Sequence, residues 1–178
     1  MKPLIFLDID GVLNAHDANK YSICDIHADK IDLLNHLVEL TGAEVVISSA
    51  WRYMILGGAM STEGFRYMLV THGLASFVKI VGCTKSDEEI PERGDQISDF
   101  LNQSEWPAYV ILDDGSEVPQ ERCLTMTESI IARHGDRWVK IDGTLGFTAA
   151  DVIRAANMLP RVSRGRKESE CSTHIHFS

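Results

Sequence analysis

Two pairs of aspartates in this sequence directly follow apolar stretches, and their spacing suits phosphate and metal chemistry. Asp8 and Asp10 come after the run LIFL, and Asp113 and Asp114 come after the run YVIL. Carboxylates brought together repel one another unless a cation joins them. Magnesium is a hard cation that takes oxygen ligands, commonly one or two carboxylates together with a substrate phosphate. The sequence therefore predicts a magnesium site with these four aspartates as its candidate ligands.

The residues around these aspartates add to the prediction. Asp8 and Asp10 are two positions apart, so at the end of a strand we expect their side chains to lean to the same side. Gly11 follows them and allows a turn that a residue with a Cβ would resist, which places it among the expected substrate contacts. Ser48 ends a third apolar stretch, EVVIS. The structural alternative is that these residues only form turns and cap helices.

The elements that must position these residues alternate along the chain. Apolar and β-branched segments predict strands, amphipathic periodicity with capping residues predicts helices, and the alternation of the two is typical of a parallel sheet. We expect an α/β fold of three layers, Rossmann-like, with a central parallel sheet of five strands. In such sheets ligands bind beyond the carboxyl ends of the strands. The predicted strands are 2–9, 44–49, 77–81, 108–113 and 138–141, and the predicted helices are 28–40, 61–72, 94–103 and 148–159.

Length and charge limit the organisation and the partners. The 178 residues suit one domain, predicted at 1–160, followed by a basic and flexible tail at 161–178. The chain has a net charge of −9, and because the tail carries +2, the remainder carries −11. Such an acidic body is a poor generic binder of nucleic acid. No apolar run is long enough for a membrane helix, and four scattered cysteines without a CxxC pair indicate reduced thiols in the cytoplasm.

Three segments resemble the motifs of haloacid dehalogenase (HAD) superfamily phosphatases. FLDIDGVLN resembles their first motif, VISSAW the second and ILDDG the fourth, in the family's order and spacing over residues 2–159. The chain is most similar to small, nearly capless members that act in nucleic-acid repair, including the phosphatase domains of polynucleotide kinase-phosphatases. No GxxxxGK[ST] loop is present, so the kinase half is not expected.

The resemblance implies a role for each matching residue. Asp8 would be the nucleophile that forms an aspartyl-phosphate, and Asp10 the acid and base for the leaving group and the water. Ser48 would hydrogen-bond a phosphoryl oxygen. Magnesium would be bound by Asp8, by the backbone carbonyl of Asp10 and by Asp114, with Asp113 as a ligand or a support.

Several assignments stay open at this point. Arg93, directly before a predicted helix, and Lys85, on the loop after the third strand, compete for the basic residue of the third motif. Ser49 replaces Ser48 if the strand register differs by one. Arg52 either reaches the substrate or pairs with a surface acid.

Trp51 either stacks on a nucleobase or belongs to the core. The gap between Asp10 and Ser48 leaves room for a flap at 12–27, and the gap from Ser48 to Arg93 contains a loop at 53–60. Neither gap is large enough for a full cap domain. An open site of this kind admits bulky substrates.

The expected function is therefore magnesium-dependent hydrolysis of a phosphate monoester, on a nucleotide or a nucleic-acid end. The alternatives are a catalytically silent phosphate-binding module on the same fold, a sugar-phosphate phosphatase and a phosphotransferase. The expected partner is a phosphorylated small molecule or nucleic-acid end, with no membrane. The sequence leaves the oligomeric state open.

Overall fold

The computed structural model describes residues 2–15, 26–103, 107–115 and 125–162. These residues form a five-stranded, all-parallel sheet in the order β3-β2-β1-β4-β5. The strands are β1 Leu4–Leu7, β2 Glu44–Ile47, β3 Ile80–Cys83, β4 Tyr109–Asp113 and β5 Trp138–Lys140. The predicted α/β fold with a parallel sheet is confirmed. The strand order reverses at β1, so the carboxyl ends of β1 and β4 flank the position where such sheets bind ligands.

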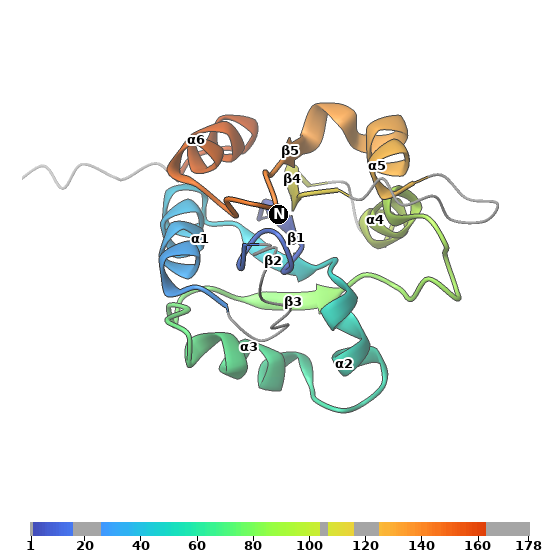
Figure 1. The fold of residues 1–178 in the computed structure, drawn as a ribbon, viewed down its shortest axis with the longest axis horizontal. Coiled ribbons are helices and arrows are strands. Elements are labelled where there is room, and N and C mark those ends of the chain that lie inside the picture. Colours follow the sequence, from blue (N-terminus) through green and yellow to red (C-terminus); the bar gives the residue numbers. More distant parts are fainter. Residues whose placement is uncertain (1, 16–25, 104–106, 116–124, 163–178) are drawn as a thin grey trace, which may run out of the picture.

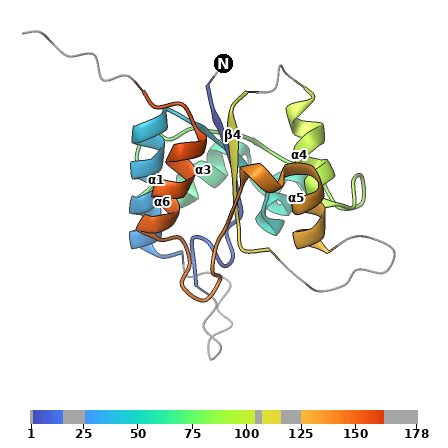
Figure 2. The same ribbon diagram turned by 90° about the horizontal axis from the view of Figure 1, so that it is seen from above.

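Helices cover both faces of the sheet (Figures 1 and 2). Helices α1 (Ala28–Thr41), α3 (Thr62–Val70) and α6 (Ala149–Met158) contribute to the core on one face. Helices α4 (Arg93–Leu101) and α5 (Met126–His134) contribute to the core on the other face. Side chains of β1 alternate between these two cores, as expected of a central strand buried on both sides. The short helices are η1 (Ala50–Arg52), α2 (Tyr53–Leu56) and η2 (Gly135–Arg137).

Local sequence signals explain several boundaries. Gly42 ends α1 in the left-handed conformation, with φ of 65°. Ser61 and Thr148 cap α3 and α6 through their hydroxyl groups, and the Thr148 cap is a full capping box with Asp151. These are the positions at which the sequence predicted helix starts and stops.

Four predictions about the elements need correction. The third strand was expected at 77–81, but Phe77 is exposed and pairing with β2 begins only at Ile80. Helix α5 was not predicted. The expected loop at 53–60 begins with helix α2. The first strand ends at Leu7, two residues earlier than expected.

Two other expectations fall mostly outside the described residues. The expected flap at 12–27 lies largely in the undescribed range 16–25, and the tail after residue 162 is also undescribed. At the start of the predicted tail, the backbone N–H of Val162 donates to the carbonyl of Leu40, so the chain still contacts α1 at this position. The helices of the described residues include none with the length and hydropathy of a membrane span.

Candidate active site

Polar residues form one row along the carboxyl edge of the sheet. The backbone N–H groups of Thr84, Ser48 and Asp8 each donate to the carbonyl of a neighbouring strand's last residues, at 2.9–3.0 Å. The ladder register places Asp113 beside Asp8. The row Thr84, Ser48, Asp8 and Asp113 therefore crosses four adjacent strands. It follows from the parallel registers, which between β2 and β3 include a one-residue shift at Val45 and Val46, because equivalent residues of parallel strands lie side by side.

The acidic cluster consists of Asp8, Asp113 and Asp114. One carboxylate oxygen from each lies within 4.8 Å of the others. Asp8 and Asp113 are buried, and Asp114 is partly buried. Burial, together with the negative charge of Asp8, raises the pKa of Asp113 to about 7, against the opposing effect of Arg93. Carboxylates held this way are a site for a cation.

Arg93 is the basic residue that the fold brings to this cluster. It is the first residue of α4 and is 7% exposed, and its Nη1 lies 3.1 Å from Asp113 and 3.9 Å from Asp8. The start of α4 is fixed against α5, because the N–H of Gly94 donates to the hydroxyl of Ser129 at 2.7 Å. A Cβ on Gly94 would approach the Ser129 carbonyl oxygen to 2.4 Å, so only glycine permits this packing.

Lys85 lies differently from Arg93. Its ammonium group is 3.4 Å from the carboxylate of Asp99, a residue of α4, and its side chain is 43% exposed. Of the two candidates for the third-motif cation, the geometry favours Arg93. A substrate contact by Lys85 remains a prediction.

Arg52 is buried, at 1% exposure, and forms what we call the arginine clamp. Its guanidinium donates to the backbone carbonyls of Ser48, Ser49 and Lys85 and to the carboxylate of Asp87. Asp87 also accepts hydrogen bonds from Tyr53 and Gln96. Although burial acts in the opposite direction, these bonds hold the pKa of Asp87 below its usual value. The contacts favour the alternative of pairing with an acid: Arg52 ties the loop after β2 to the loop after β3.

The two serines after β2 have different surroundings. The hydroxyl of Ser49 accepts from the N–H of Trp51 and caps η1. The hydroxyl of Ser48 is buried and has no hydrogen-bond partner among the described residues. An unsatisfied buried hydroxyl is costly, and a bound phosphoryl group would satisfy it. The geometry thus favours Ser48 over Ser49 as the phosphate contact.

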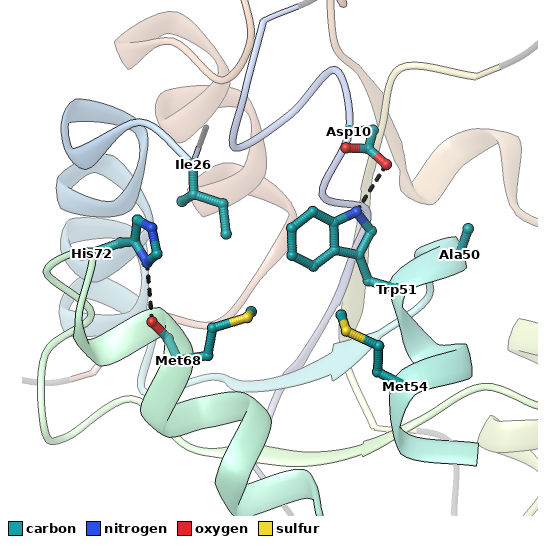
Figure 3. Close-up of a pocket in the computed structure, with 7 residues that line it drawn as sticks. All are labelled: Asp10, Ile26, Ala50, Trp51, Met54, Met68 and His72. Atoms are coloured by element: carbon teal, nitrogen blue, oxygen red, sulfur yellow. Dashed lines mark hydrogen bonds between the residues drawn. The ribbon is translucent and has the colours of Figure 1, made fainter. Parts of the chain in front are cut away.

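Asp10 lies in the turn after β1 and is not a member of the acidic cluster. Its carboxylate accepts from the Trp51 indole N–H at 2.9 Å (Figure 3). It also accepts from the Asn14 amide at 2.9 Å. Strand β1 ends at Leu7, so the strand alternation from which a shared side for Asp8 and Asp10 was predicted does not extend to these two residues, and their shared side stays a prediction. Gly11 adopts the predicted turn, with φ of 73°, and its N–H donates to Asn14.

A comparison with protein families identifies the chain. A model described as the HAD domain in Swiss Army Knife RNA repair proteins matches residues 4–152. The chain belongs to this family. The matched range contains every residue of the HAD site described above, from β1 into α6. No curated protein and no solved structure shows a significant match.

The acidic cluster of this HAD domain fits magnesium. Three carboxylate groups offer hard oxygen ligands close together, as the ion requires, and HAD families typically use Mg²⁺. The sequence also named the Asp10 carbonyl as a ligand. The separate position of the Asp10 side chain is compatible with a contribution by the backbone alone.

Sequence reasoning missed two residues of the site. Asn14, which binds both Asp10 and Gly11, belongs to the stretch FLDIDGVLN that resembles the first motif, but it was given no role. Thr84 was missed because the third strand was placed about three residues too early, which hid its position at a strand end. Its buried hydroxyl, like that of Ser48, has no partner among the described residues.

Proposed function

We propose that this HAD domain is a magnesium-dependent phosphomonoesterase that forms an aspartyl-phosphate on Asp8 and removes a terminal phosphate from a nucleotide or nucleic acid. The observation that carries the proposal is the separation of its acidic groups. Asp8 belongs to the acidic cluster beside Arg93, whereas Asp10 is held outside it by Trp51 and Asn14. A nucleophile and an acid/base need such different surroundings.

The first half of the reaction forms the covalent intermediate. A carboxylate oxygen of Asp8 attacks phosphorus, and the bond from phosphorus to the leaving oxygen breaks. Asp10 gives its proton to that oxygen, so the alcohol leaves neutral. The guanidinium of Arg93 and the hydroxyl of Ser48 stabilise the charge on the phosphoryl oxygens.

The second half releases phosphate. Asp10, now a carboxylate, takes a proton from water, whose oxygen attacks phosphorus and breaks the bond to Asp8. The acidic cluster and the Asp10 carbonyl would hold magnesium, which neutralises charge on the phosphoryl oxygens when bound. Without a cation, a phosphate dianion would meet the negative charges of the cluster.

The description of the family supports the substrate class. Its members are HAD domains in RNA repair proteins, which favours a phosphate on an RNA end as the substrate. The described part of the chain between β2 and α4 contains η1, α2, α3 and β3, which is less than a cap domain. An open site of this kind suits a polymer end better than a small molecule that needs enclosure.

The test is a hydrolysis assay with magnesium and with a chelator. Substrates should include a chromogenic phosphate monoester, mononucleotides, sugar phosphates and oligoribonucleotides with a 3′ or 5′ phosphate. We expect phosphate release that needs magnesium and is fastest with the nucleotide or the oligonucleotides. Binding without turnover on every substrate would contradict the proposal, and so would a preference for sugar phosphates.

A further inference from the structure

An apolar pocket opens beside Asp10, and its lining residues include no member of the acidic cluster. It has a volume of about 520 Å³, a size typical of sites for small organic groups. Figure 3 shows the residues that line it: Asp10, Ile26, Ala50, Trp51, Met54, Met68 and His72. The proposed reaction leaves this pocket without a role.

The pocket is connected to the site through Trp51. The indole N–H donates to Asp10 at 2.9 Å, and the rest of the ring extends from Asp10 toward the pocket (Figure 3). Asp10 is the group proposed to protonate the leaving oxygen. Whatever is attached to that oxygen must therefore lie near Asp10, and the pocket is adjacent to it.

The residues that line the pocket indicate which kind of chemical group it can bind. Trp51 offers an aromatic ring, and Met54 and Met68 offer polarizable thioethers that contact aromatic rings favourably. A sugar placed here would leave most of its hydroxyl groups without partners, which is costly. A flat heteroaromatic ring matches these walls.

His72 supplies one polar group to the same pocket. Its Nδ1 lies 3.0 Å from the carbonyl oxygen of Met68. A carbonyl can only accept, so Nδ1 is the donor in this contact, and in the neutral tautomer that makes this bond Nε2 is an acceptor. Adenine, guanine, cytosine and uracil each carry an N–H group that can donate to it.

From these contacts we propose that the pocket binds the nucleobase of the terminal nucleotide, the one whose phosphate is removed. The proposal rests on the proposed function and makes it more specific. The base would stack on Trp51 between the two methionines and donate to His72. Because a paired base cannot enter, the substrate is an unpaired end.

The experiment compares two substrates that differ only in the base. Oligoribonucleotides with a terminal phosphate, at the 3′ or the 5′ end, are prepared with a normal terminal nucleotide and with an abasic one. Wild-type protein with magnesium should hydrolyse the normal substrate with a kcat/KM roughly tenfold or more above that of the abasic one, mainly through KM. Equal values for the two substrates, at both ends, would overturn the proposal while leaving the proposed function intact.

A pair of variants on α3 locates the effect. Met68→Lys puts a charge into the pocket and should bring the ratio between the two substrates close to one. Tyr67→Lys adds the same charge one residue away, at a side chain that is 68% exposed, and should retain the wild-type ratio. A Met68→Lys protein that folds and keeps the full ratio would contradict the proposal. Hydrolysis of neither oligonucleotide by wild type would refute the proposed nucleic-acid substrate, and the base pocket with it.

Discussion

The acidic cluster and the arginine clamp both contain buried charge, but they balance it differently. In the clamp, Arg52 donates to three carbonyls and to Asp87, and Asp87 has further donors of its own. In the cluster, the positive charge of Arg93 does not offset burial and the negative charge of Asp8, so the pKa of Asp113 is raised to about 7. Satisfied charge of the first kind fixes the shape of a loop. The unbalanced negative charge of the cluster lowers the stability of the folded protein until a cation or substrate binds, as is expected of a functional site.

The largest expected effect is that of a substitution at Asp8. If this effect were absent, the acidic cluster could not be the functional half of the comparison. Asp8→Asn should abolish turnover, since an amide oxygen is not the required nucleophile. The same change should leave the melting temperature unchanged or raise it, because it removes a negative charge beside Asp113. Activity and thermal unfolding are measured on the same preparation. A folded Asp8→Asn protein with substantial activity would refute the assignment.

The next effect compares two basic residues. Arg93→Ala should lower kcat by roughly 10²–10³-fold, the usual result of removing one charge-stabilising group. Lys85→Ala removes a half-exposed ammonium paired with Asp99 and serves as the matched control, expected to change kcat less than threefold. The reverse order would show that Lys85 is the third-motif cation.

Substitutions in the arginine clamp should lower the stability of the protein. Arg52→Met keeps an apolar stem but removes the guanidinium hydrogen bonds to three backbone carbonyls, at an expected cost of about 2–4 kcal/mol in the free energy of unfolding. Asp87→Asn affects a side chain that is 54% exposed, so its cost should stay below about 1 kcal/mol. Denaturant titration measures both. If Arg52→Met were as stable as wild type but failed to bind substrate, Arg52 would be a substrate contact after all.

Ser48 connects the two regions, because it lies beside Asp8 at the edge of the sheet and its carbonyl belongs to the clamp. Its carbonyl is part of the clamp, whereas its hydroxyl has no partner among the described residues. Ser48→Ala should therefore leave stability unchanged or slightly increased while lowering kcat/KM roughly tenfold to a hundredfold. Ser49→Ala should show the opposite, a small loss of stability from the cap and little loss of activity. An exchange of these results would mean that Ser49 is the phosphate contact.

The smallest effect is that of the metal on stability. Magnesium at about ten times its Kd should stabilise the protein by about 1.4 kcal/mol, or a few degrees in melting temperature. Asp114→Asn should reduce this increase. A melting temperature that does not respond to magnesium would argue against the acidic cluster as its site.

The fold was largely predictable because strands buried on both faces and capped helices leave local signals. The continuous apolar runs LIFL and YVIL indicate strands that are covered by helices on both faces of the sheet. Thr148 marks the start of one helix and Gly42 the end of another. Helix α5 carried such a signal as well, since Thr125 and Glu128 form a capping box, but it was overlooked. The third strand was misplaced because Phe77 and Val78 extend its apolar run without joining the ladder.

The site was predictable only in part, because partners distant in sequence are invisible to local patterns. The aspartates and Ser48 were found from strand ends and spacing. The bonds from Trp51 to Asp10 and from Arg52 to Lys85 cross 41 and 33 residues, and nothing in the local sequence indicates them. Contacts of this kind decide that the charge of Arg52 is balanced by hydrogen bonds and that the charge of the acidic cluster is not.

Direct detection of the covalent intermediate tests the central claim. The wild-type protein with magnesium and an excess of substrate is quenched in acid after a short reaction, and its peptides are analysed by mass spectrometry. The account predicts a phosphate on the peptide that contains Asp8, absent when magnesium is chelated and absent in Asp8→Asn. Magnesium-dependent hydrolysis that leaves no phosphate on this peptide and persists in Asp8→Asn would contradict it.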